Sequence, residues 1–123
     1  IQVASLALGF SSNQGFGLRM AWSPTGQYIA IAFGPDSSQA QSALILYQFT
    51  RANNTLTQIQ EVLLTGTISF VMRDVAWRSD EQYIAITTTQ NLLVYQFNQI
   101  AKTLSLVASI TNNSSRYSSC SWS

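Results

Sequence analysis

The sequence predicts an all-β protein built from repeated four-stranded units, and three observations carry that prediction. A segment around Trp22 returns around Trp77, 55 residues later. Only 9% of the residues are charged, whereas an average soluble protein has roughly 25%, and uncharged polar residues suit turns and half-exposed strands. No stretch shows the 3.6-residue periodicity of an amphipathic helix.

Two matches define the repeat. The segment MAWSPTGQYIAI at 20–31 returns as VAWRSDEQYIAI at 75–86. The segment LILYQF at 44–49 returns as LLVYQF at 92–97, only 48 residues later. The first unit therefore holds seven extra residues (55 − 48 = 7) between its two matched segments. The underlying period of about 45 to 48 residues is typical of one blade of a β-propeller, a ring of four-stranded sheets.

The first two strands of each unit are expected to form a hairpin. First strands are predicted at 18–23 and 72–78, and second strands at 28–33 and 83–88, where apolar and small residues alternate or run continuously. The segments between them hold residues typical of tight turns, namely Pro24-Thr25-Gly26 and Ser79-Asp80-Glu81.

The third and fourth strands follow the same scheme. Third strands at 43–49 and 92–97 are rich in β-branched and aromatic residues. Fourth strands are predicted at 56–64 and 104–110, after turns at Asn53-Asn54 and Gln99-Ile100.

Partial units flank the two complete ones. The letters VASL at 3–6 resemble VASI at 107–110 and predict an outer strand. The letters SCSWS at 119–123 begin another first strand, expected over 117–123. The chain thus divides into an outer strand of a preceding blade (1–8), two blades (18–64 and 72–110) and the first strand of a following blade (117–123).

These strands are too few to close a propeller, which takes about four to eight blades. An open blade would expose unpaired strand edges, which native proteins avoid. The sequence therefore predicts part of a larger propeller, closed either by further blades of the same chain or by copies of the chain.

The segment Ala21-Trp22-Ser23-Pro24-Thr25-Gly26 resembles the first hairpin of a WD repeat. The chain departs from that family in several places, since it has no His and carries Tyr47-Gln48 and Tyr95-Gln96 where the family has Trp-Asp. The hydrogen-bonded tetrad of regular members therefore cannot form. The resemblance implies a divergent propeller held mainly by apolar packing, in which the recurring Trp22, Trp77 and Trp122 form the core between blades.

The resemblance also implies a binding face. In that family the loops before the first strand and between the second and third strands share one face, which here places 9–17, 34–42, 65–70, 89–91 and 111–116 together. Aromatic and Arg side chains are enriched at interface anchors. The predicted partner-binding residues on this face are Phe16, Arg19, Phe70, Arg73, Arg116 and Tyr117.

Other function classes have little support. The net charge is +1 and the six Lys and Arg residues are scattered, so no basic stripe predicts nucleic-acid binding. No apolar run is long enough to cross a bilayer. With no His, no phosphate loop and no base near Cys120, we predict no catalytic, metal or cofactor site. Cys120 is interpreted as a half-buried strand residue and Asp80-Glu81 as a turn.

The sequence thus predicts a non-catalytic protein–protein interaction scaffold. The alternative is a carbohydrate-binding or surface-assembly module built from propeller repeats. A lectin of that kind is expected to show a shallow pocket in each blade, with an aromatic face beside amide or carboxylate groups.

Overall fold

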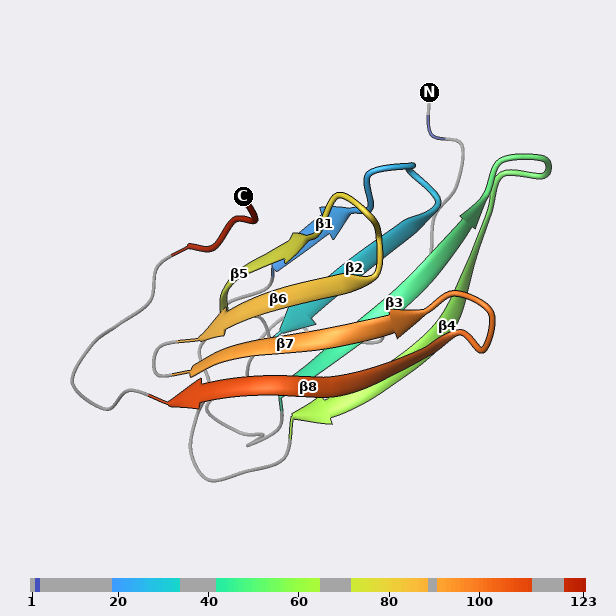
Figure 1. Ribbon diagram of the computed structural model, residues 1–123. Helices are drawn as coiled ribbons and strands as arrows, with labels where there is room; N and C mark the ends of the chain where they lie inside the picture. Colours follow the sequence, from blue (N-terminus) through green and yellow to red (C-terminus); the bar gives the residue numbers. More distant parts are fainter. Residues whose placement is uncertain (1, 3–18, 34–41, 65–71, 89–90, 112–118) are drawn as a thin grey trace.

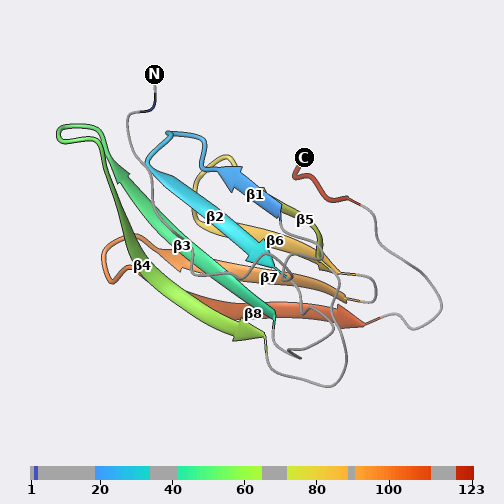
Figure 2. The same ribbon diagram turned by 180° about the vertical axis from the view of Figure 1, so that it is seen from behind.

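The computed structural model describes residues 2, 19–33, 42–64, 72–88, 91–111 and 119–123. The protein is all-β in these residues, with two four-stranded antiparallel sheets and no helix. No helix among the described residues is long and apolar enough to cross a membrane. Figures 1 and 2 show the two sheets stacked face to face, with β1 beside β5.

Each sheet follows the order of its strands in the chain. Sheet 1 contains β1 (Arg19–Trp22), β2 (Tyr28–Phe33), β3 (Ser42–Thr50) and β4 (Thr55–Leu64). Sheet 2 contains β5 (Met72–Trp77), β6 (Tyr83–Thr88), β7 (Asn91–Asn98) and β8 (Thr103–Thr111). Each of these eight strands lies within two residues of its predicted position at both ends. The predicted strand at 3–8 lies outside the described residues.

The first strand predicted over 117–123 stays a prediction, since its described part, residues 119–123, pairs with no described strand. Strand assignment requires ladder hydrogen bonds to a neighbouring strand. Instead, this segment is tied to sheet 2 by Cys120 and Trp122, as described below.

The repeat extends to details of pairing and turn geometry. In both sheets the third and fourth strands pair with one register shift, at Leu46/Tyr47 in sheet 1 and Val94/Tyr95 in sheet 2. Asn54 and Lys102 take matching positive φ values of 56° and 58° in the following hairpins. Since a β-bulge and a left-handed turn residue both fix strand register, the two units share one local architecture.

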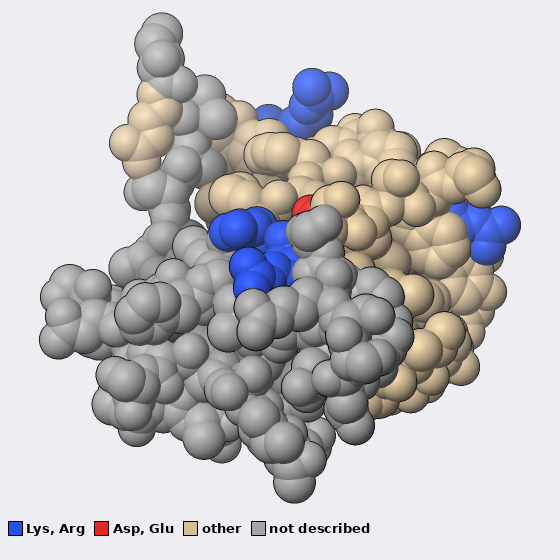
Figure 3. Space-filling model, turned by 90° about the vertical axis from the view of Figure 1, so that its left-hand side faces the viewer, with Lys and Arg blue, Asp and Glu red and all other residues tan. Residues whose placement is uncertain are grey.

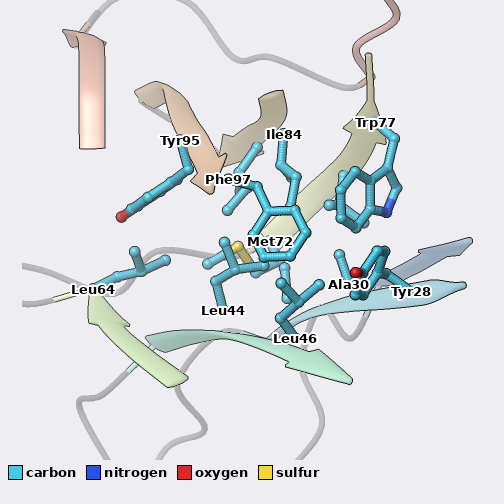
Figure 4. Close-up of a cluster of buried hydrophobic side chains, with 13 residues drawn as sticks. Tyr28, Ala30, Leu44, Leu46, Leu64, Met72, Trp77, Ile84, Tyr95 and Phe97 are labelled. Atoms are coloured by element: carbon cyan, nitrogen blue, oxygen red, sulfur yellow. The ribbon is translucent and has the colours of Figure 1, made fainter. Parts of the chain in front are cut away.

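The main core lies between the sheets. Alternating residues of β2 and β3 face sheet 2, which places Tyr28, Ala30 and Leu44 in the interface. Figure 4 shows Trp77 beside Tyr28, and Met72 in the middle of the cluster. The buried members of this cluster are Tyr28, Ala30, Ala32, Leu44, Leu46, Leu64, Met72, Val75, Trp77, Ile84, Ile86, Tyr95 and Phe97.

A contact made by the recurring Trp also repeats. The indole Nε1 of Trp77 donates to the carbonyl of Ala21 at 3.1 Å, and the Nε1 of Trp122 donates to the carbonyl of Ala76 at the same distance. Ala21 and Ala76 each precede the Trp of their own unit. Each Trp thus binds the unit before it.

The predicted core position holds for Trp77, which is only 9% exposed. Trp22 differs, because it is 51% exposed on the face of sheet 1 turned away from sheet 2. Its indole has no unit before it among the described residues.

Candidate interaction site

The structure brings together two of the six predicted partner-binding residues. Arg19 begins β1 and Arg73 is the second residue of β5. The Nε of Arg19 donates to the backbone carbonyl of Arg73 at 3.0 Å. Phe16, Phe70, Arg116 and Tyr117 lie outside the described residues.

Arg73 occupies an irregularity of sheet 2. Met72 pairs with Thr88 and Asp74 with Thr87, so Arg73 is the extra residue of a β-bulge. A bulge bends its strand and changes the direction of a side chain, and bulges are common beside functional sites.

The guanidinium of Arg73 has unused hydrogen-bonding capacity. Its Nε is buried and has no hydrogen-bond partner among the described residues. Leaving a buried donor unsatisfied costs about 1–3 kcal/mol, and more when the group is charged. An Arg fork is matched by the two oxygens of a carboxylate or phosphate. The face of the molecule drawn in Figure 3 carries a group of Lys and Arg side chains near its centre, with Asp or Glu atoms beside the group.

Asp74, which follows Arg73, is engaged in holding the chain. One carboxylate oxygen accepts from the Val75 amide and the other from the Cys120 amide, both at 2.9 Å. The position equivalent to Asp74 in the first unit is Arg19, so the charge is reversed between the units. Asp74 ties 119–123 to sheet 2 and does not offer a free base.

Cys120 is half-buried, as predicted. Burial is the main cause that raises the pKa of its thiol, and the negative charge of Asp74 raises it further. A protonated thiol is a poor nucleophile and a poor metal ligand. Among the described residues, no group of His, Cys, Asp and Glu could hold a metal ion.

At the opposite end of sheet 2, a shallow hollow of about 460 Å³ lies between two hairpin turns. Its lining is mostly amide and hydroxyl groups. Its aromatic member, Phe97, is only 2% exposed and offers no open ring face. The lining residues are Asp80, Gln82, Gln96, Phe97, Asn98, Gln99, Ile100, Thr103 and Ser105.

Beside this hollow, Glu81 joins the two sheets. Its side chain accepts from the amide of Thr25 at 2.8 Å and from the Thr25 hydroxyl, and Gln99 donates to its other oxygen at 3.2 Å. Burial raises the pKa of Glu81, but hydrogen bonds from Ser23, Thr25 and Gln99 together outweigh burial and hold it below the usual value. The carboxylate is therefore a structural contact between units.

The sequence interpretation of Asp80 and Glu81 as a turn describes only part of their role. Asp80 accepts from the Gln82 amide at 3.0 Å, which is ordinary turn chemistry. Glu81 is instead 4% exposed, with φ of 61°. The sequence contains a sign of this second role, because Glu81 aligns with Gly26 of the first unit. In the structure Gly26 has a φ of 76°. A large acid at a glycine-favouring position indicates a specific contact.

The comparisons with known proteins bear on the fold alone. No family model matches the chain, and no curated protein does. A functionally unknown protein from Desulfotomaculum acetoxidans DSM 771 is similar, with 20% identity and a TM-score of 0.61 over 87% of this chain and 31% of that chain. A protein from Lactobacillus plantarum is also similar, with 20% identity and a TM-score of 0.62 over 79% of this chain and 28% of its own. The chain thus spans less than a third of each similar structure.

Proposed function

We propose that this chain contributes successive blades to a WD-repeat-like β-propeller that serves as a non-catalytic protein–protein interaction scaffold. The observation that carries the proposal is the repeated contact in which Trp77 and Trp122 each donate to the preceding unit at 3.1 Å. A unit that binds its predecessor by one recurring contact is related to it by one recurring rotation, as in a propeller or solenoid.

The partner site of the scaffold is proposed at Arg19 and Arg73. The bulge at Arg73 supports this assignment, as does the hydrogen bond that holds Arg19 on the Arg73 backbone. Paired guanidinium groups suit an Asp, Glu or C-terminal carboxylate on a partner protein.

The test is binding by the Arg19→Ala/Arg73→Ala double variant. Partners captured by the complete protein are identified by mass spectrometry, purified and titrated against each form. We expect binding to weaken at least about tenfold, equivalent to about 1.4 kcal/mol. The matched control is Arg51→Ala, which removes an exposed Arg from the β3–β4 hairpin. Equal affinity of the double variant and the control would remove the Arg pair from the site.

Carbohydrate binding is the second candidate, favoured by the amide-lined hollow of sheet 2. Two observations make carbohydrate binding a weaker proposal than the interaction scaffold. Phe97 offers no open face for a sugar ring, and the equivalent positions of sheet 1 replace Asp80 by Thr25 and Gln99 by Arg51. If titration with neutral oligosaccharides changes the chemical shifts of Gln82 and Gln96, carbohydrate binding becomes the favoured function.

A further inference from the structure

The turn between β3 and β4 carries a match to the acceptor pattern of N-linked sugars. Asn53, Asn54 and Thr55 follow Asn-x-Thr, with no proline at the middle position. Such a bulky modification belongs on a surface segment, and all three residues are exposed. Figure 1 shows that this hairpin projects away from the other strands. The described residues therefore leave the turn accessible to a modifying enzyme.

The acceptor amide and the hydroxyl that the pattern requires already lie together. The Oγ1 of Thr55 donates to the Oδ1 of Asn53 at 2.8 Å. This bond uses only the oxygen of the amide, and the Nδ2 of Asn53 donates to no other described residue. The nitrogen atom that an N-linked sugar joins is thus without a partner among the described residues.

The turn does not depend on an Asn at position 53. The equivalent turn of sheet 2, 48 residues later, has Ala101 there, followed by Lys102 and Thr103. The middle residues of the two turns have nearly the same backbone angle, with φ of 56° at Asn54 and 58° at Lys102. Since the same turn forms with an Ala, the amide of Asn53 has no necessary part in turn formation.

The hairpin of sheet 2 contains an Asn with the opposite properties. The Oδ1 of Asn98 accepts from the amides of Ile100 and Ala101, both at 3.0 Å. Asn side chains commonly organise turns in this way. Asn98 does not fit the acceptor pattern, because Ile100 stands two residues after it. Asn98 is therefore a structural residue, whereas Asn53 makes no such bond to the described backbone.

We infer that Asn53 is a site of N-linked glycosylation that takes its sugar from a glycosyl diphosphate, either lipid-linked or nucleotide-linked. In the transfer, the Nδ2 of Asn53 bonds to the anomeric carbon of the sugar and gives up one proton. The bond from that carbon to the diphosphate oxygen breaks, and the diphosphate leaves with its electron pair.

A sugar on Asn53 leaves the proposed partner site uncovered. Arg19 pairs with Ala32, which in turn pairs with Leu44. Leu44 lies six residues (50 − 44 = 6) before Thr50, the end of β3, which is about 20 Å along a strand. The sugar and the partner site are thus at opposite ends of sheet 1, and the inference does not rest on the proposed function.

The test is the mass of the tryptic peptide 52–73 from the protein purified from the cells that produce it. Trypsin cuts after Arg51 and Arg73, so the peptide contains Asn53 but not the other acceptor patterns, at 112–114 and 113–115, which lie outside the described residues. We expect the peptide to carry the added mass of one or more sugar residues, and fragmentation to place that mass on Asn53.

Variants made in the same cells separate the acceptor pattern from the turn. Asn53→Gln and Thr55→Ala are expected to lose the added mass completely, whereas Thr55→Ser keeps it, because Ser also fits the pattern. The matched control is Asn54→Lys, which copies the residue of sheet 2 and leaves the pattern intact. This control is expected to carry the same sugar as wild type.

Two results would overturn the inference. One is a peptide 52–73 of unmodified mass in the wild-type protein. The other is a sugar that persists in Asn53→Gln, since it would then be attached to a hydroxyl. Transfer to Asn53 by the soluble fraction of the cells identifies a nucleotide-linked donor, and transfer only by the membrane fraction identifies a lipid-linked one. None of these results depends on whether Arg19→Ala/Arg73→Ala loses its partner.

Discussion

The two sheets contain the same pair of aromatic side chains in two different environments. Trp22 and Phe49 meet edge to face at 5.8 Å and 83°, and Trp77 and Phe97 meet at 5.9 Å and 79°. Yet Trp22 is 51% exposed and Trp77 is 9% exposed. The geometry within a sheet follows from the repeated sequence, whereas burial of the pair follows from a neighbouring sheet.

The turns of the first hairpin also differ between the two sheets, because only the turn of sheet 2 binds the other sheet. Gly26 takes its positive φ without a steric penalty, and no atom of the described residues lies near the position of a Cβ. Glu81 takes a similar φ and uses its side chain to bind the other sheet. The second unit therefore accepts backbone strain at a position where it gains a contact between units.

The largest expected difference is between the two Trp positions. Trp77→Ala is expected to destabilise the protein by about 3–5 kcal/mol, as for other large core truncations, because it removes a buried side chain and its hydrogen bond to Ala21. Trp22→Ala is expected to cost less than half as much. Urea unfolding of both variants measures the two losses, and equal losses would show that burial does not distinguish the sheets.

Glu81→Gln is expected to destabilise by about 1–3 kcal/mol, because a neutral amide binds the Thr25 amide and hydroxyl less well than a carboxylate. Glu81→Gly relaxes the backbone and removes the contact, so comparing the two variants in urea separates strain from binding. A gain in stability for Glu81→Gln would mean that the charge opposes folding.

The Glu81 contact also predicts a pH dependence. Because the pKa of Glu81 is lower in the folded than in the unfolded protein, its contribution is complete above the unfolded value of about 4.3 and is lost as the pH falls through the folded pKa. We expect wild type to lose more stability than Glu81→Gln on going from pH 6 to below pH 4. Parallel urea-unfolding profiles of the two proteins would contradict this.

The smallest expected effect is at the last hairpin. The Nζ of Lys102 donates to the Tyr28 hydroxyl at 2.6 Å, across the two sheets. Lys102→Asn removes this bond but suits the positive φ, as Asn54 does in sheet 1, so we expect a net loss of about 0.5–1 kcal/mol. The reverse change, Asn54→Lys, has no partner to gain and serves as the control in the same melts.

The local architecture was predictable because strands and tight turns depend on nearby residues. Period-2 and continuous apolar segments located all eight described strands, and the offsets of 55 and 48 residues aligned them into two units. The strand predicted over 117–123 stays a prediction, because a strand is assigned only where a second strand pairs with it and residues 119–123 pair with no described strand.

The sequence predicted Arg19 and Arg73 as partner-binding residues, but only as members of the loop face. Their contact, in which Arg19 binds the Arg73 backbone, depends on β1 lying beside β5. The bulge at Arg73 was not visible in the sequence, since it depends on the pairing of β5 with β6. Lys102 was also missed, because its partner Tyr28 is 74 residues away.

The sequence by itself determined the all-β class, the strand order within each unit and the turn positions, because these depend on hydrophobic pattern and on residues close in the chain. Only the tertiary structure decided which Trp is buried, that Glu81 binds Thr25, and that one face of sheet 2 stays open. Those properties depend on which surfaces of the two sheets pack together. Two copies of one hydrophobic pattern contribute differently to stability when only one of them is buried by a neighbouring sheet.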